Sequence, residues 1–529
     1  MQRVAAFAAT GGWAGLRAGR ASLFAAGRDG RGGGLRRVPP VGGLGGGVVP
    51  PAGGRPPPPA STVAGGVPPP GGRLPSPPPA STAATGASPW APLPPTLHPR
   101  IAVVGGGFGG LYTALKLAAL PWSRLQRPTI TLIDASPRFV FLPMLYEVAA
   151  GTAAGWEVAP RYADLLADEP LITHLQATAT EVDASAGTVT VVPAGGAGAP
   201  VALPYDRLVV AVGGRPTQPD IPGLKEHGLP LHSYEAAMAV KRALTLAVAA
   251  GRRRRVPAAV VVVGGGYSGV EMASTVADRY GADVAVSLVT TSDGIMPNAA
   301  EASRAAGAAA LTAGGVTLVP RMRVAALTDE TVTLVPATDR SAGAGAAAEC
   351  IAPADVVIWT AGAVPATAGL PGVSGGAPLV GGKVAVDECL RVPGAVGVYA
   401  LGDAAATTGG DAPTAAAAVQ QAEVAGWNVW AGLTGQAPLA YAQVYLGEML
   451  TLGGRGASVA TPFGLNLDGA PAAVVRRAAY LARMPTAGHR RRVAASWGSA
   501  AVLAAVQELT GWGEAAPDGV RRDSVAPVE

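Results

Sequence analysis

The chain has 529 residues, 49% of them hydrophobic, and a formal net charge of +5 at pH 7. This length exceeds one ordinary domain, so we expect two or three domains with apolar cores. Residues 1–99 hold nine arginines and one acid (+8), which leaves 31 basic and 34 acidic side chains (−3) in the remainder. Because the positive charge is concentrated in the leader, nucleic acid is not an expected partner.

Cysteine and histidine usage argues against two further kinds of chemistry. Cys350 and Cys389 form no C-x-x-C pair, which argues against dithiol chemistry and favours a thiol-reducing compartment. The five histidines are scattered, so no metal site is predicted. No apolar run reaches the ~20 residues that a bilayer-crossing helix needs, so we expect no transmembrane segment.

Residues 1–98 are predicted to lie outside the folded domains. Residues 1–37 combine small and apolar residues with seven arginines and one acid, a composition typical of an organellar transit peptide. A disordered basic tail is the alternative. Residues 38–98 are rich in Pro, Gly, Ala and Ser and have too few large apolar residues to form a core, so we expect a linker.

The stretch IAVVGGGFGG, residues 101–110, has the pattern of a dinucleotide-binding turn. An apolar strand enters three glycines in G-x-G-x-x-G spacing, and a helix is predicted over residues 111–120. Gly105 would allow the tight turn, Gly107 the close approach of a pyrophosphate, and Gly110 close packing of helix and strand. The N-terminus of the helix would face the phosphates.

The segments that follow extend this first unit. A second apolar run over residues 129–133 ends at Asp134, where an acid would bind a ribose hydroxyl. Residues 138–151 and 156–166 are aromatic and apolar, which fits either a wall beside a flat ring or ordinary core. Residues 208–212 form an apolar strand that meets a glycine turn.

The pattern then recurs. An apolar strand over residues 260–263 enters the second motif and a helix follows. The glycines of this motif are Gly264, Gly266 and Gly269. The next strand, residues 284–289, aligns with residues 129–133, so Thr290 is the counterpart of Asp134. Two such units in one chain predict two bound dinucleotides.

Other segments complete the predicted order. A helix over residues 233–250 precedes Arg252–Arg255, which we interpret as a solvated loop, with a ligand site as the alternative. A strand over residues 356–361 meets a turn at Gly362. A later strand delivers Asp403 to the start of an Ala-rich helix, residues 413–431, where the carboxylate would bind a ribitol chain and the helix dipole would face a flavin ring.

Beyond residue 440 the pattern changes. A helix over residues 471–484 carries Arg476, Arg477 and Arg483, and no acid occurs between 471 and 492. Arg490–Arg492, Trp497 and the apolar run 500–506 follow. A basic amphipathic segment with a tryptophan is typical of binding to a membrane surface, and a helix packed on its own protein is the alternative.

These motifs resemble the two-dinucleotide flavoprotein reductases, and more narrowly the type II (alternative) NAD(P)H:quinone oxidoreductases. Within these they are similar to the C-type alternative dehydrogenases of plants, algae and cyanobacteria. The resemblance spans about residues 100–510. Its carriers are GGGFGGLYTAL, RFVFLPMLYEVAAG, GGGYSGVEMA, VIWTAG, YALGDAA, APTAAAAVQQAE and LGEMLTLG.

The resemblance implies an α/β fold of two Rossmann-like dinucleotide-binding domains, with the NAD domain inserted in a discontinuous FAD domain. The expected ranges are 1–98 for the leader and linker, 99–235 and 375–465 for the FAD domain, 236–374 for the NAD(P)H domain, and 466–529 for a C-terminal membrane-association segment.

The resemblance also implies roles for single residues. The residues expected to bind FAD are Gly105, Gly107, Gly110, Asp134 and Asp403. Those expected to bind NAD(P)H are Gly264, Gly266, Gly269, Thr290 and Gly362. Glu271 matches a glutamate near the nicotinamide, and Gln420 and Gln421 match glutamines of the quinone site. Ala416 stands where the family has a further glutamine, which affects the shape of the quinone pocket.

The implied reaction transfers a hydride from NAD(P)H to the flavin and then two electrons to a membrane quinone. The rival predictions are a sulfide:quinone or disulfide reductase and a non-catalytic NAD(P)H-sensing membrane-surface protein. The family implies a homodimeric, peripheral membrane protein. The expected location is the chloroplast, on its membranes or lipid particles, or alternatively the mitochondrial inner membrane.

Overall fold

The computed structural model describes residues 98–510, apart from residues 196–197, 218, 339–349, 411 and 455, with side chains as far as residue 501. The predicted transit peptide and almost all of the predicted linker lie outside the described residues, as do residues 511–529. None of the helices in the described part combines the length and apolar character needed to cross a bilayer.

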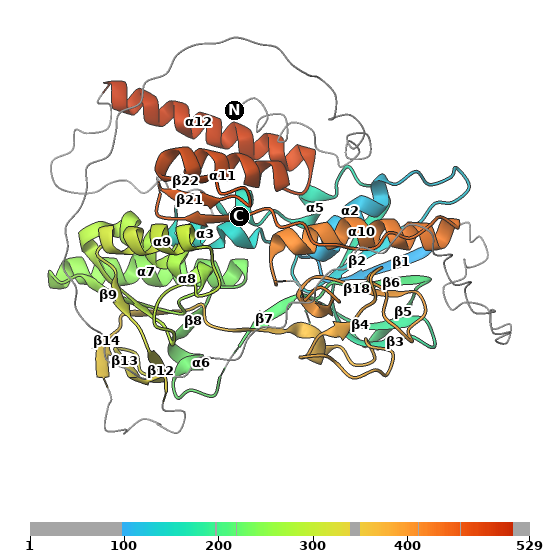
Figure 1. The fold of residues 1–529 in the computed structure, drawn as a ribbon, viewed down its shortest axis with the longest axis horizontal. Helices are drawn as coiled ribbons and strands as arrows, with labels where there is room; N and C mark the ends of the chain where they lie inside the picture. Colours follow the sequence, from blue (N-terminus) through green and yellow to red (C-terminus); the bar gives the residue numbers. More distant parts are fainter. Residues whose placement is uncertain are drawn as a thin grey trace, which may run out of the picture. The chain divides into compact units, whose positions relative to one another are not determined.

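The first unit is built on a seven-stranded sheet in the order β18-β6-β1-β2-β3-β4-β5. Its strands are β1 (Arg100–Val104), β2 (Thr129–Asp134), β3 (Ile172–Asp183), β4 (Thr188–Pro193), β5 (Val201–Pro204), β6 (Arg207–Val210) and β18 (Val398–Ala400). From β18 to β3 the neighbours are parallel, and β3, β4 and β5 form an antiparallel meander. Helices α2 (Phe108–Ala119) and α10 (Ala415–Thr434) pack together on one side of the sheet (Figure 1).

The second unit is built on a five-stranded parallel sheet in the order β11-β10-β9-β15-β8. Its strands are β8 (Gly228–Pro230), β9 (Ala258–Val263), β10 (Val284–Val289), β11 (Thr317–Val319) and β15 (Val356–Trp359). The helices that accompany it are α7 (Tyr234–Arg254), α8 (Tyr267–Tyr280) and α9 (Glu301–Ala313). The other face packs on an antiparallel sheet of β12 (Met322–Leu327), β13 (Thr331–Pro336) and β14 (Cys350–Pro353).

The sequence of β9 explains this sandwich. Its valines alternate between two apolar clusters: Val260 and Val262 pack with the helices, whereas Val261 and Val263 pack with residues of the antiparallel sheet. A strand buried on both faces needs an unbroken apolar run, and the sequence AAVVVV supplies one.

The predicted internal repeat is confirmed, because the orders β3-β2-β1-β6 and β11-β10-β9-β15 correspond. The Gly105 N–H donates to the Ile133 carbonyl at 2.8 Å, and the Gly264 N–H donates to the Val289 carbonyl at 2.8 Å. Ile133 and Val289 are therefore equivalent, and so are the residues that follow them, Asp134 and Thr290.

Two small strand pairs complete the body. Strands β7 (Gly214–Pro216) and β16 (Ala363–Pro365) are antiparallel and join the two units, and β17 (Val384–Ala385) pairs with β19 (Ala405–Ala406). Strand β8 belongs to the second sheet although it precedes residue 236, the expected start of the NAD(P)H domain. The short helices are α3 (Leu145–Ala150), α4 (Gly155–Val158), α5 (Tyr162–Leu165) and α6 (Leu224–His227).

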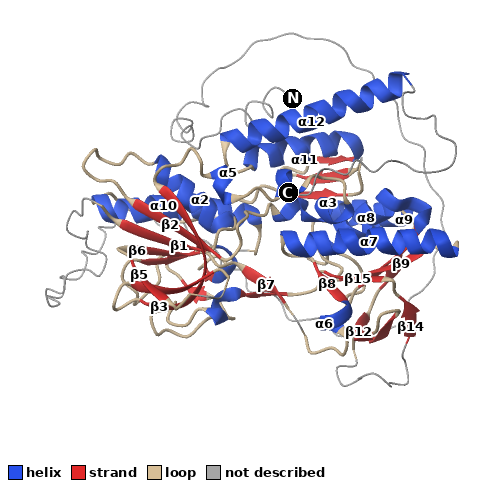
Figure 2. Cartoon of the chain, turned by 180° about the vertical axis from the view of Figure 1, so that it is seen from behind, coloured by secondary structure: helices blue, strands red, loops and turns tan. Residues whose placement is uncertain are grey.

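The C-terminal part is a small layer of its own. Strands β20 (Glu448–Thr451), β21 (Ala457–Ala460) and β22 (Asn466–Asp468) form an antiparallel sheet. Helix α11 (Gly469–Arg483) packs on β21 and β22, and α12 (Ala487–Thr510) contacts α11. Figure 2 shows the two helices lying side by side above helix α3.

The structure corrects the predicted loop at Arg252–Arg255. Arg252–Arg254 form the last turn of α7 and Arg255 is its left-handed C-cap. The side chains are exposed as expected, and two pair with acids, Arg252 with Asp283 at 2.6 Å and Arg254 with Asp355 at 2.8 Å. Cations at a helix C-terminus are favourable because they face the negative end of the dipole, so the charge run extends the helix.

Gly110 offers a test of the fold. A β-carbon at this position would lie 1.7 Å from the Gly105 carbonyl oxygen. We expect Gly110→Ala to lower the free energy of unfolding by about 3 kcal/mol, because backbone of the turn must move. Gly107→Ala is the matched control in protein freed of FAD: no protein atom lies within 4 Å of its β-carbon, and its cost should stay below about 1 kcal/mol. Thermal unfolding of both variants checks this, and equal stabilities would contradict it.

Candidate functional site

In the first glycine turn, the backbone packs closely against one glycine and leaves space beside another. Gly105 has φ +94° and its β-carbon would lie 2.3 Å from the Ala211 carbonyl oxygen, so only glycine fits. Gly107 is the N-cap of α2, and no protein atom lies within 4 Å of its β-carbon position. The turn thus leaves open space at the N-terminus of a helix whose first N–H groups lack partners within the helix.

Asp134 lies at the carboxyl end of β2, beside this turn. Its carboxylate accepts the Gly106 N–H at 2.6 Å and the Ser136 N–H at 2.7 Å. Burial raises the pKa of Asp134, and the two N–H bonds oppose that shift. Tyr162 also holds the turn, because its hydroxyl donates to the Gly106 carbonyl at 2.8 Å. Asp134 is therefore fixed at the edge of the glycine turn.

The second turn repeats this construction. Gly264 has φ +121°, a β-carbon at Gly269 would lie 1.8 Å from the Gly264 carbonyl oxygen, and nothing lies within 4 Å of one at Gly266. Thr290 is buried, and its hydroxyl is 2.9 Å from that of Ser292. No carboxylate stands in the position that Asp134 occupies in the first unit.

Gly362 lies on the opposite side of the second turn. It follows β15 with φ +74°, and a β-carbon there would lie 2.2 Å from the Thr217 hydroxyl oxygen. The preceding Thr360 donates its hydroxyl to the Val263 carbonyl at 2.9 Å. The carboxyl ends of β9, β10 and β15 therefore meet at one edge, which is where ligands bind to parallel sheets.

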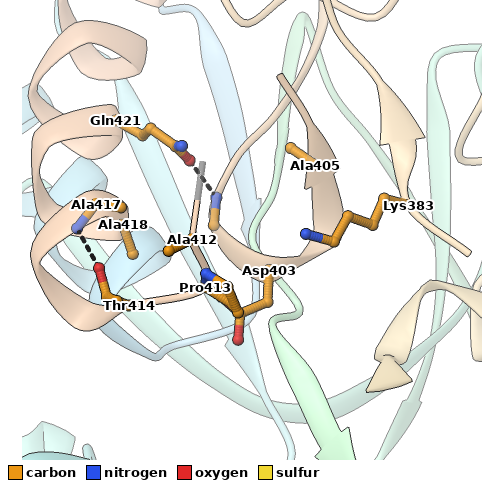
Figure 3. Close-up of a pocket in the computed structure, with 10 residues that line it drawn as sticks. Lys383, Asp403, Ala405, Ala412, Pro413, Thr414, Ala417, Ala418 and Gln421 are labelled. Atoms are coloured by element: carbon orange, nitrogen blue, oxygen red, sulfur yellow. Dashed lines mark hydrogen bonds between the residues drawn. The ribbon is translucent and has the colours of Figure 1, made fainter. Parts of the chain in front are cut away.

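The end of β18 meets the start of α10 in a shallow pocket (Figure 3). Gly402 donates its N–H to Oε1 of Gln421 at 2.6 Å, and Thr414 caps α10 by accepting the Ala417 N–H at 3.1 Å. Asp403 and Lys383 line the same pocket. Burial raises the pKa of Asp403, and the charge of Lys383 opposes that shift.

Gln420 and its neighbour Gln421 bind different parts of the chain. Its Oε1 accepts the Val444 N–H at 2.8 Å and its Nε2 donates to the Val444 carbonyl at 3.0 Å. Gln421 is buried, whereas Gln420 lies at the surface of α10. Two consecutive glutamines thus fix two different backbone segments, one in the first unit and one in the segment that follows α10.

Glu271 lies in α8 and is buried against the C-terminal sheet. Its Oε1 accepts the Thr451 N–H at 3.0 Å. Burial is the largest influence and raises the pKa of Glu271 to about 8, against the opposing effects of the Thr451 bond and the charge of Arg476. The carboxyl group is therefore mostly protonated and neutral at pH 7.

Around Glu271 lies a buried polar cluster from three other elements. Tyr146 of α3 donates its hydroxyl to Thr451 of β20 at 2.6 Å. Arg476 of α11 donates to the Tyr146 hydroxyl at 3.2 Å and to Glu147 at 2.5 Å. The side chains of Arg476 and Glu147 are 4% and 5% exposed, so this ion pair is an interior one.

This cluster contains one arginine of the predicted basic amphipathic helix. Arg476 faces the interior and pairs with Glu147. Arg477 lies 5.2 Å over the Trp497 ring, and both residues are partly exposed, so this arginine and this tryptophan contact each other at the surface. The aromatic stretch 138–151 was interpreted as wall or core, and its two consecutive polar residues, Tyr146 and Glu147, were missed. An acid within an apolar run is the signal that would have indicated a buried partner.

The residues present fit two dinucleotides. In each glycine turn the last glycine has no room for a β-carbon and the middle glycine has free space beside it. Both middle glycines are the N-caps of helices. Asp134 and Asp403 supply carboxylates beside the first turn only. The first turn therefore fits a ligand with hydroxyl groups. At the second turn, Thr290 is compatible with either a hydroxyl or a phosphate on the ribose.

Comparison with known proteins agrees with this geometry. The family model for pyridine nucleotide-disulphide oxidoreductases matches residues 99–422. The chain belongs to this family. It is 36% identical over 415 residues to the demethylphylloquinone reductase NdbB of Synechocystis, which covers 76% of this chain and 96% of that protein. It is 34% identical over 433 residues to the alternative NAD(P)H-ubiquinone oxidoreductase C1, chloroplastic/mitochondrial, of Arabidopsis thaliana, which covers 76% and 81%.

These relatives confirm the predicted resemblance to the type II NAD(P)H:quinone oxidoreductases. Among solved structures, NDH2 from Plasmodium falciparum in complex with NADH superposes with a TM-score of 0.64 at 16% identity, over 74% of this chain and 96% of that one. The sulfide:quinone oxidoreductase of Aquifex aeolicus gives 0.59 at 20% identity, over 73% and 92%. At these identities the likeness shows the fold, and the predicted α/β class with two Rossmann-like units is confirmed.

The raised pKa of Glu271 predicts a pH dependence of stability. The folded protein retains a proton on Glu271 between about pH 5 and about pH 8, where the unfolded chain releases it, so this group makes the free energy of unfolding fall as pH rises through that window. Glu271→Gln removes the effect. We expect the variant to match the unmodified protein near pH 5 and to exceed its stability near pH 9 in thermal unfolding. The exposed Glu226→Gln is the control, and identical pH profiles for all three proteins would contradict the assignment.

Proposed function

We propose that this protein is an FAD-dependent NAD(P)H:quinone oxidoreductase, which passes two electrons from NAD(P)H to a membrane quinone without pumping protons. The observation that carries the proposal is the pair of equivalent glycine turns. In each turn a β-carbon on the last glycine would overlap a backbone carbonyl oxygen, and no protein atom lies within 4 Å of one on the middle glycine. Two relatives that are at least 34% identical and aligned over most of their length are by name reductases of quinones.

FAD is assigned to the first unit. Gly105 and Gly110 shape its turn, Gly107 leaves room for the pyrophosphate, and Asp134 and Asp403 are placed to bind the ribose and the ribitol chain. We assign residues 99–235 and 375–465 to the FAD domain, apart from β8, which belongs to the second sheet, and β20 and β21, which belong to the C-terminal layer. Strand β18 joins the first sheet after the second unit has ended, and α10 packs on α2 beside it.

NAD(P)H is assigned to the second unit. Gly266 leaves room for the pyrophosphate beside the fixed glycines Gly264 and Gly269, and Gly362 faces the turn from β15. Thr290 neither binds a 2′-hydroxyl as a carboxylate would nor repels a 2′-phosphate, so both NADH and NADPH are donors. The NAD(P)H domain takes residues 236–374.

When bound, the flavin accepts a hydride from the nicotinamide and delivers two electrons to the quinone. The chain's own residues position and shield these groups. Glu271 lies where α8 packs on β20, and its carboxyl group holds a proton. Because it is then uncharged, it does not disfavour the negative charge of a reduced flavin. Glu271, Gln420 and Gln421 act through position, and no nucleophile of the protein takes part.

The quinone is assigned to the side of α10 that carries Gln420 and Gln421. Ala416, one turn earlier, has a short side chain where the family has a glutamine, so the pocket there is wider and less polar. Plastoquinone, a phylloquinone-type naphthoquinone and ubiquinone are the candidate acceptors.

Attachment to the membrane surface is assigned to the C-terminal segment, residues 466–529, together with the turn before β22. Phe463, Leu465 and Val474 are 93%, 55% and 69% exposed, which is unusual for large apolar side chains that lie close together in sequence. Arg491 and Arg492 are exposed on α12 and suit an anionic surface. We infer a homodimer in the chloroplast, or alternatively at the mitochondrial inner membrane, as in the family.

The two cysteines do not favour a sulfide or disulfide reductase. Cys350 is exposed in β14, and Cys389 is buried between β17 and β18. Neither lies in a glycine turn or at the carboxyl end of β1, at the edge of the first sheet where the flavin is assigned. A non-catalytic NAD(P)H-sensing protein is the remaining rival.

Spectroscopy of the purified protein tests the function. We expect the visible absorption bands of bound FAD, loss of these bands when NADH or NADPH is added without oxygen, and their return when quinone is added. Liposome-bound protein allows plastoquinone, phylloquinone and ubiquinone to be compared. A colourless protein would overturn the proposal, and a flavin reduced by NAD(P)H that quinone does not reoxidise would favour a different acceptor.

Donor choice supplies a second prediction. Thr290→Asp places in the second unit the acid that Asp134 supplies in the first. The carboxylate should bind the ribose hydroxyls of NADH and repel the 2′-phosphate of NADPH, so the NADH/NADPH ratio of kcat/KM should rise about tenfold or more. Thr290→Asn is the uncharged control. An unchanged ratio in steady-state assays would show that Thr290 does not face the ribose.

A further inference from the structure

The segment between α10 and β20, residues 436–447, has no regular secondary structure and is referred to below as the strap. It runs back along α10, because residues later in the strap bind residues earlier in the helix. Trp427 donates its indole N–H to the Ala437 carbonyl at 3.1 Å. Asn428 binds both backbone groups of Leu439, at 2.7 Å and 2.8 Å.

Gln420 repeats, two helical turns earlier, the arrangement that Asn428 makes. A side-chain amide offers one acceptor and one donor side by side, which matches the N–H and C=O of a single residue in an extended segment. Without a neighbouring strand, the backbone groups of the strap need such partners. Gln420 is thus the last of three α10 side chains that fasten the strap, and it fastens the end nearest to the candidate site.

The strap lies between α10 and the start of α8. At its α10 side, Gln420 binds the backbone of Val444, and the next residue, Gln421, accepts the Gly402 N–H beside Asp403 of the first unit. At its other side, Tyr445 bonds Glu448, and Glu448 in turn bonds Tyr267, the first residue of α8 after Gly266. The strap therefore extends from α10, whose N-terminus adjoins Asp403, to the start of α8, whose N-terminus we assign to NAD(P)H.

The side chains of the strap at this end are apolar and exposed. Val444, Tyr445 and Leu446 are 43%, 54% and 37% exposed. An acceptor dissolved in lipid carries an apolar side chain, and three consecutive apolar residues provide a surface for it. Because Gln420 binds the backbone of the first of them, it determines where all three lie.

We propose that Gln420 is a positioning residue, which fixes Val444–Leu446 as the wall along which the apolar side chain of the quinone approaches the flavin. Gln420 acts through the strap and makes no hydrogen bond to the quinone ring. The inference rests on the proposed function and adds to it an assignment of how one residue serves the acceptor.

The first experiment measures the strap directly in the FAD-containing, full-length protein. We expect Gln420→Ala to increase hydrogen exchange at the Val444 amide about tenfold or more, because that N–H loses its acceptor. Trp427→Phe, which removes the fastening at the far end of the strap, is the matched control and should leave exchange at Val444 unchanged. Unchanged exchange in Gln420→Ala would overturn the proposal whatever the activity of the protein.

The second experiment separates the side chain of the quinone from its ring. With a decyl-substituted benzoquinone, Gln420→Ala should raise KM about fivefold or more, whereas kcat, the rate of flavin reduction by NADH, and KM for a tail-less benzoquinone should change less than about twofold. An equal loss with both quinones would mean that Gln420 contacts the ring, and would overturn the proposal while leaving the proposed function intact. No quinone turnover in the unmodified protein would defeat the function itself.

A double-mutant cycle tests whether Gln420 works through Val444. Val444→Pro removes the N–H that Gln420 accepts. If both changes break one interaction, the double variant should be no worse in KM for the decyl quinone than the more affected single variant. Additive losses would show that Gln420 acts independently of the strap and would overturn the proposal.

Discussion

The packing of the C-terminal helices depends on the interior ion pair between Arg476 and Glu147, because it bonds α11 directly to α3 across 329 residues of sequence. Taking two charges out of water is costly, and the pair is tolerated only where geometry and further hydrogen bonds compensate. Here Tyr146 and Thr451 supply those bonds, and Glu271 remains neutral beside them. Helix α3 of the first unit, α8 of the second and the C-terminal layer therefore meet at one polar cluster.

The repeated turns explain how one type of unit holds two different dinucleotides. Both turns use the same backbone contacts, with a β-carbon at the last glycine placed 1.7 Å and 1.8 Å from a carbonyl oxygen. The difference lies in the residue after the second strand, Asp134 in one unit and Thr290 in the other. The two turns thus share one backbone construction and differ in the side chain at the end of the second strand.

The sequence was sufficient for features that depend on local pattern. The strands before each glycine turn, the equivalence of Asp134 and Thr290, and the helix that starts after Asp403 follow from periodicity and glycine spacing, which act over a few residues. The arginine run at the end of α7 was misjudged because its stabilisation comes from the helix dipole and from acids on other elements.

Features set by distant partners could not be predicted. Arg476 and Glu147 are 329 residues apart. The acid within the apolar run 138–151 indicates a buried partner, but nothing in the sequence indicates that this partner is Arg476. The resemblance marked Gln420 and Gln421 as site residues, but only the structure shows that one holds Gly402 and the other Val444. Side-chain bonds to the backbone of irregular segments have no sequence signature, because any residue type can accept them.

The orientation of α11 has a practical consequence for biochemists who want a detergent-free preparation. The same helix that displays Val474 to the outside sends Arg476 into the interior. Deleting the C-terminal helices would leave Glu147 buried without its counter-ion, which lowers the free energy of unfolding by about 3–5 kcal/mol for an interior pair. It would also expose the polar cluster around Glu271 to water. Replacing Phe463, Leu465 and Val474 with polar residues removes the exposed apolar surface and leaves the Arg476–Glu147 ion pair intact.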